Sequence, residues 1–164
     1  MMKPSEQFSF PIAVFDRPTW MPLLELSTRE VFEIMLGTRV CLMDPVGENN
    51  GEFTALVGLA GGLNGVFSIR CSSDAACVMA GKMLGLPPAE AGKERWDALG
   101  EIANMIAGNF KAKLSGVGNH CMLSVPAIIV GSDYRSRCLS PTHALEVVFE
   151  FEKKPLWITL ELHA

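Results

Sequence analysis

The 164-residue sequence lacks the features of several large protein classes. It has no cluster of Lys and Arg, and its net charge of −4 argues against nonspecific nucleic-acid binding, which needs cations set against phosphates. No apolar run is long enough to span a bilayer, so no membrane association is expected. The N-terminus has no basic region, apolar core and cleavage site of a signal peptide, which favours a cytoplasmic protein.

Cysteine chemistry is also sparse. The five cysteines are odd in number, scattered, and contain no C-x-x-C pair, so we expect neither a disulfide framework nor a zinc site. We interpret them as small buried hydrophobes. They are Cys41, Cys71, Cys77, Cys121 and Cys138.

Two common catalytic arrangements are missing as well. The glycines at 61, 62 and 65 are not part of a G-x-x-x-x-G-K-[S/T] phosphate loop, and we interpret them as a hairpin turn between two strands. The three histidines have no Ser and Asp partners spaced for a triad.

The patterning that is present predicts an α+β domain. We expect helices at 27–36, 73–84 and 95–114, and strands at 39–44, 52–59, 65–70, 120–130, 144–151 and 156–162. This order favours a six-stranded, mostly antiparallel sheet with three helices on one face.

The first 25 residues differ in composition from the rest of the chain. Residues 1–25 hold four prolines without a helical or strand period, which predicts an extended arm preceding a single domain at 26–164. Ser27 followed by Glu30 resembles a capping box that would open the first helix, and Gly37 is placed to end it.

The long run at 95–114 is the most informative stretch. Its apolar side chains recur at helical spacing and predict a buried stripe, made of Trp96, Leu99, Ala103, Ile106, Phe110 and Leu114.

The opposite side of this helix, here called the polar face, consists of Asp97, Glu101, Asn104 and Gly108, with Gly100 at its edge. One Asn and two Gly cost a helix about 2–3 kcal/mol relative to Ala. A merely solvated face would more cheaply carry Glu, Lys, Gln and Ala. The acid and the carboxamide three residues apart project side by side, and the glycines leave room for another backbone. We therefore expect this face to meet a partner.

The motif also resembles a known family, the CheC/CheX/FliY chemotaxis phosphatases, and most closely CheX. The residues that carry the resemblance are Asp97, Glu101, Asn104, Gly108 and Leu114, with Pro126 near the position of a family proline. The resemblance extends from about residue 26 to the C-terminus. It implies a protein that removes the phosphoryl group from the aspartate of a CheY-like response regulator.

The resemblance assigns roles to these side chains. Asn104 would hold the attacking water in line with phosphorus, as a Gln does in GTPases, and Glu101 would pair with a Lys of the partner. Asp97 would support the start of the helix, and Gly108 would give clearance. The protein would need no cofactor of its own, with Mg²⁺ expected on the response regulator, and it would form a homodimer, for which the C-terminal strands offer pairing edges.

Two other functions fit the same sequence. The helix could hold a response regulator without hydrolysing its phosphate, or the chain could be a module of a flagellar switch. An intact Glu101 and Asn104 pair favours catalysis, because a scaffold has no need of an Asn in mid-helix.

A faint internal repeat is visible. Glu30, Glu33 and Gly37 have the same spacing as the Glu–Asn–Gly set of the long helix. An old duplication would explain the match, and three matched positions can also arise by chance. A carboxylate at position 33 cannot donate a hydrogen bond and would repel a phosphoryl group, so this half would be inactive.

Overall fold

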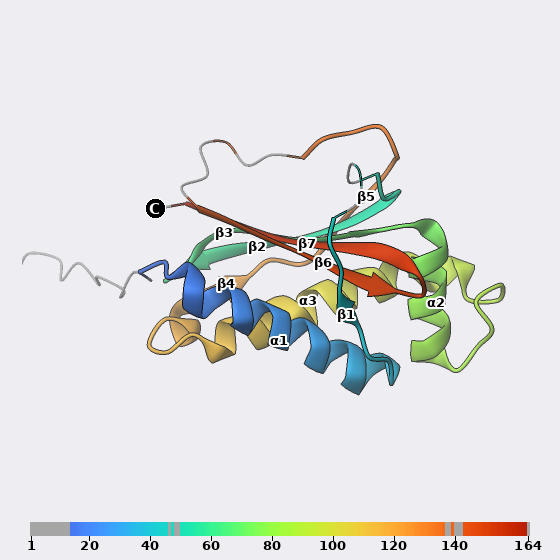
Figure 1. Ribbon diagram of the computed structural model, residues 1–164, viewed down its shortest axis with the longest axis horizontal. Coiled ribbons are helices and arrows are strands. Elements are labelled where there is room, and N and C mark those ends of the chain that lie inside the picture. Colours follow the sequence, from blue (N-terminus) through green and yellow to red (C-terminus); the bar gives the residue numbers. More distant parts are fainter. Residues whose placement is uncertain (1–13, 46, 48–49, 137–138, 140–142, 164) are drawn as a thin grey trace, which may run out of the picture.

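The computed structural model describes residues 14–45, 47, 50–136, 139 and 143–163. Figure 1 shows the long helices lying on one side of an antiparallel sheet. The helices are α1 (Arg17–Leu36), α2 (Ser73–Leu84) and α3 (Arg95–Lys113), with 3-10 turns η1 (Gly92–Glu94) and η2 (Gly118–His120). The strands are β1 (Cys41–Leu42), β2 (Phe53–Gly61), β3 (Asn64–Cys71), β4 (Cys121–Leu123), β5 (Ala127–Val130), β6 (His143–Phe151) and β7 (Lys154–His163). The predicted α+β class, with helices on one face, is confirmed.

The sheet has seven strands in the order β1-β6-β7-β3-β2-β4, and β5 also pairs with β2. The six expected strands become seven because the stretch at 120–130 is divided. Pro126 has no N–H for the ladder, and Ser124 leaves the strand while its N–H donates to the carbonyl of Gly58 at 2.9 Å. Its hydroxyl in turn accepts from the Gly58 N–H at 2.8 Å.

The strand order has a pseudo-two-fold symmetry. The hairpins β2–β3 and β6–β7 meet at the central β3–β7 pairing, and each hairpin has a short edge strand on its outer side. β4 and β5 flank the first hairpin and β1 flanks the second. Along the chain, α1 precedes β1 and α3 precedes β4. The predicted pseudo-symmetric halves are therefore present in the topology. A duplication as their origin remains a hypothesis.

The core lies between the helices and one face of the sheet. Alternate residues of the central strands point into it, among them Phe67, Ile69 and Leu160, which are fully buried. The ring of Trp20 on α1 meets that of Phe110 on α3 edge-on at 6.1 Å between centroids. The two helices are thus joined through the same core.

The prediction of an extended arm up to residue 25 is wrong for the described part of that segment. α1 begins at Arg17, ten residues before the expected cap at Ser27, which is instead buried in mid-helix. Pro18 sits in the first turn, where a proline removes no helical hydrogen bond. Pro22 gives up one such bond, and the burial of Trp20 and Leu24 compensates for that loss. Residues 1–13 lie outside the described residues.

The end of α1 agrees with expectation. Gly37 adopts φ +60°, and its N–H donates to the carbonyl of Glu33 at 3.0 Å. The left-handed conformation explains why a glycine stands at this position.

The cysteine interpretation holds for two of the described cysteines. Cys71 and Cys121 are buried, and burial raises the pKa of the Cys71 thiol to about 12. Cys41 is exposed on the edge strand and Cys77 is half-buried, while Cys138 lies outside the described residues. None of the described helices is long and apolar enough to cross a membrane.

Candidate functional site

Helix α3 is positioned by its apolar stripe. Leu99, Ala103, Ile106 and Phe110 are fully buried, which fixes the rotation of the helix about its axis. Asp97 lies in the first turn and two lysines lie in the last, so both ends complement the helix dipole. The opposite side of the helix is thereby directed away from the core.

The structure brings the predicted polar face together on that side. Asp97 and Glu101 are exposed, and Asn104 and Gly108 are half-buried. Within the described part of the chain, the carboxylate of Glu101 and the carboxamide of Asn104 make no hydrogen bond or ion pair. Both groups therefore remain available to a molecule that docks on α3.

The two glycines of this helix differ in what they face. Gly100 is buried, and a Cβ built on it would lie 3.5 Å from Pro126 Cβ and 3.6 Å from Ile128 Cδ1. The room expected there for a partner is thus filled by the protein's own β5 edge. At Gly108 the nearest atom to such a Cβ is Leu123 Cδ1 at 3.8 Å.

The prediction that Trp96 is buried is wrong. The residue sits at the margin of the apolar stripe and is 47% exposed. The neighbouring Arg95 occupies the space over the core instead, with its guanidinium carbon 5.3 Å from the ring centroid of Phe53 and 5.5 Å from that of Trp96.

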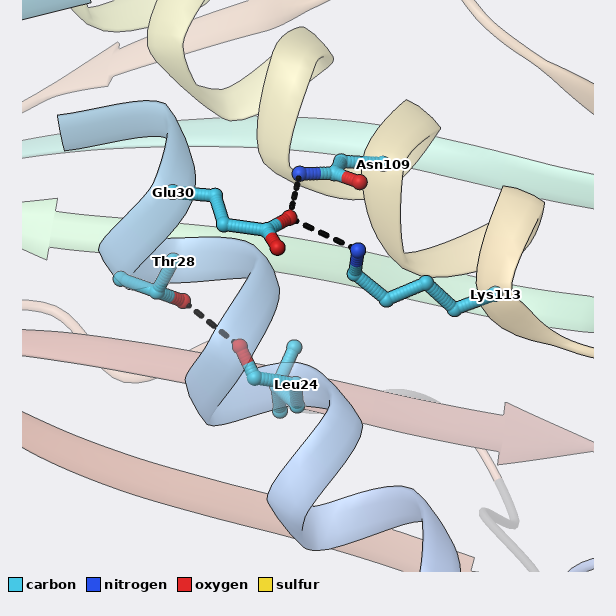
Figure 2. Close-up of polar contacts among 5 residues, drawn as sticks. All are labelled: Leu24, Thr28, Glu30, Asn109 and Lys113. Carbon is cyan, nitrogen blue, oxygen red and sulfur yellow. Dashed lines mark hydrogen bonds and ion pairs between the residues drawn. The ribbon is translucent and has the colours of Figure 1, made fainter. Parts of the chain in front are cut away.

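A polar cluster between α1 and α3 was not foreseen from the sequence. Figure 2 shows Asn109 Nδ2 and Lys113 Nζ converging on one carboxylate oxygen of Glu30, at 2.8 and 2.7 Å. These two hydrogen bonds, that from Lys113 first, lower the pKa of Glu30. Two residues before Glu30, the Thr28 hydroxyl donates to the Leu24 carbonyl one turn back along α1, at 2.9 Å. From the sequence, Glu30 had a role only in a capping box with Ser27, or through the spacing that it shares with Glu101, and neither predicted its contacts with α3.

The polar face of α3 lies outside the two hollows that flank α1. Two hollows of about 300 and 350 Å³ lie beside α1, the first lined in part by Arg29, Glu33 and Cys41, the second by Met21, Glu25 and Glu146. Neither is lined by α3. Small-molecule sites are usually concave, whereas an exposed helix face suits a macromolecular partner. No group of three His, Cys, Asp or Glu able to hold a metal ion occurs in the described ranges.

Solved structures with this fold include chemotaxis proteins. The CheX protein of Vibrio vulnificus superposes with a TM-score of 0.77 at 22% identity, covering 92% of this chain and 100% of that one. A chain of the CheX-CheY-BeF3-Mg²⁺ complex from Borrelia burgdorferi superposes with a TM-score of 0.70 at 24% identity, covering 88% and 98%. These likenesses establish the fold.

Sequence comparison goes further. The CheY-P phosphatase CheX of Thermotoga maritima is 30% identical over 85 residues, which cover 51% of this chain and 55% of that relative. The match therefore spans little more than half of the relative's length. The family model for the chemotaxis phosphatase CheX matches residues 53–150, more than half of the chain, including both Glu101 and Asn104. The protein belongs to the CheX family.

Proposed function

We propose that this protein hydrolyses the aspartyl phosphate of a CheY-like response regulator. The observation that carries the proposal is the polar face of α3, where Glu101 and Asn104 stand side by side without partners in the described chain. Membership of the CheX family and the name of the Thermotoga maritima relative support it. A cytoplasmic location is part of the proposal.

Asn104 positions the attacking water. Its carboxamide oxygen accepts a hydrogen bond from that water while its nitrogen donates to the water or to a phosphoryl oxygen. The water oxygen then bonds to phosphorus as the bond from phosphorus to the aspartyl oxygen breaks, releasing inorganic phosphate and restoring the carboxylate of the regulator. The proton of the water passes to the phosphate or to solvent. A hundredfold acceleration requires about 2.7 kcal/mol, which one well-positioned water and one ion pair can supply.

Glu101 and Asp97 act outside the bond-breaking step. The exposed Glu101 carboxylate pairs with a Lys beside the phosphorylated Asp of the regulator, which orients the helix on its partner. Asp97 supports the first turn of α3, and Gly108 leaves clearance for the partner. Mg²⁺ belongs to the regulator in this proposal, which is supported by a CheX-CheY complex from Borrelia burgdorferi that contains BeF3 and Mg²⁺.

The proposal includes a homodimer, with one change from the sequence expectation. β7 is paired on both sides, so of the C-terminal strands only β6 has an open edge, covered by β1 at just two residues. The Val148 carbonyl accepts from Met43 on that side, so the backbone groups of Glu146 point the same way. Light scattering should find a dimer that Glu146→Pro converts to monomer; a wild-type monomer at all concentrations would contradict this.

The decisive experiment follows loss of phosphate from a phosphorylated CheY-type regulator with Mg²⁺. Wild type should accelerate the loss, and Asn104→Ala should abolish the acceleration while still binding the regulator. Glu33→Ala, which changes the residue three positions after Glu30 just as Asn104 follows Glu101, is the matched control and should act as wild type. Binding without acceleration against every regulator of the same genome would reject the phosphatase and leave a binding module.

A further inference from the structure

The three tryptophans of the chain have very different environments. Trp20 and Trp157 are 6% and 4% exposed, whereas Trp96 is 47% exposed in the first turn of α3. Exposing so large an apolar surface gains nothing for folding, and tryptophan is enriched among the residues that dominate binding energies at interfaces.

The side chain of Trp96 has a fixed neighbour. Arg95 Nη1 donates to the Gly92 carbonyl at 2.5 Å, and the guanidinium lies against the rings of both Phe53 and Trp96. A side chain already held in this way loses less conformational entropy on binding than a free one. Val130 pairs with Phe53 across the β2–β5 ladder, so its side chain lies on the same face of the sheet as the Phe53 ring that Arg95 covers, and it is 56% exposed.

The distance from Trp96 to the polar face matters. Eight residues separate Trp96 from Asn104, an axial rise of about 12 Å. A standard interface buries about 800 Å² per partner, equivalent to a disc of about 16 Å radius. A regulator centred on Asn104 therefore covers Trp96 as well.

We infer that Trp96 and Val130 form an apolar docking patch for the phosphorylated response regulator. This inference rests on the proposed function and deepens it. The patch contacts an apolar surface of the regulator beside its phosphorylation pocket. It contributes affinity and orientation, and the hydrolytic step stays with Asn104.

Tryptophan fluorescence gives a direct test, because one exposed tryptophan can be quenched from solvent. The probe is a tryptophan-free CheY-type receiver domain loaded with BeF3⁻ and Mg²⁺. Adding it should reduce acrylamide quenching of the wild type, and Trp96→Phe should show little quenching with or without the receiver.

Steady-state kinetics give a second test of the docking patch. Trp96→Ala should raise KM for the phosphorylated regulator by about 30-fold, the effect typical of an interface hot spot, with kcat and the urea midpoint unchanged. Leu84→Ala, which removes a similarly exposed apolar side chain from α2, should leave KM as in wild type.

The outcomes separate this inference from the proposed function. Protection of Trp96 without any dephosphorylation would leave docking in place and reject the phosphatase. Normal dephosphorylation with Trp96 still fully quenchable, or an unchanged KM in Trp96→Ala, would overturn the docking patch. Protection that appears with rising concentration of this protein alone would assign the patch to a second copy instead.

Discussion

Glu30 on α1 and Glu101 on α3 each begin a set of three residues with the same spacing in the sequence, yet their surroundings are opposite. Glu30 accepts from Lys113 and Asn109 and joins the two helices (Figure 2). Glu101 is exposed and has no partner within the described residues. The same side chain at the same spacing thus links two helices in one half and has no partner in the described chain in the other. The difference lies in what the opposing helix offers, since only α3 places a Lys and an Asn against its neighbour.

Exchanging the residues three positions after these two glutamates, Asn104 and Glu33, should have the largest effect on activity. Asn104→Glu, which copies the first half, should slow dephosphorylation by about 100-fold or more, because a carboxylate cannot donate to the water and repels the phosphoryl group. The reciprocal Glu33→Asn should add no activity, because Glu30 beside it is already engaged by α3. Phosphate release from the regulator measures both, and a gain of activity in Glu33→Asn would show that the first half is dormant only for want of one side chain.

The next largest effects should come from Gly37 and Gly108, whose replacement by Ala should change stability in opposite directions. Gly37→Ala should destabilise the protein by about 1 kcal/mol, because φ is +60° there. Gly108→Ala should stabilise it by about 1 kcal/mol, because it lies within a helix and a Cβ meets only ordinary contacts.

The dephosphorylation rate of the Gly108 variant then tests whether this glycine gives clearance to the partner. If it gives clearance to the partner, Gly108→Ala should be more stable but slower, while Gly100→Ala should be equally stabilised and fully active, because Pro126 and Ile128 already cover that site. Urea unfolding and phosphate release measure the two effects. Full activity in Gly108→Ala would remove the clearance role.

The smallest effect should come from the two glutamates. Glu30→Gln should lower the free energy of unfolding at pH 7 by at most about 1 kcal/mol, because the pair is partly exposed and screened by salt. The folded-state pKa of Glu30 is lowered from 4.5, so its stabilisation is present above that pH and is lost as pH falls through the lowered pKa. Wild type and variant should therefore converge in acid.

Glu101→Gln is the matched control for that measurement. Its free energy of unfolding at pH 7 should equal that of wild type, because Glu101 is exposed and has no partner in the described chain, and its dephosphorylation rate should fall. Equal losses of stability in both variants would contradict the assignment of separate roles.

The parts of this fold that could be foreseen are those set by local pattern. The apolar stripe of α3 predicted which side faces the core, and so which side carries Glu101 and Asn104. Gly37 predicted the end of α1 because only a local backbone conformation is involved.

The parts that could not be foreseen depend on tertiary structure. The prolines led to the prediction of an extended arm where α1 in fact begins. Trp20, Leu24 and Val31 are nevertheless buried at helical spacing. Trp96 lies at the edge of the stripe, where Arg95 takes the place over Phe53. The bonds of Glu30 to α3 join residues far apart in the sequence, since Asn109 is 79 positions from Glu30 and Lys113 lies further still.

Ser124 has a consequence for turnover. By binding both backbone groups of Gly58 and interrupting the outer strand, it leaves only the short strands β4 and β5 at the sheet edge beside the polar face. A docking protein therefore has no long row of free backbone N–H and C=O groups to pair with there, so it must be recognised through side chains. On the proposed function the docking protein is a response regulator that must leave after each hydrolysis, and an edge without free backbone groups does not hold it as an added strand.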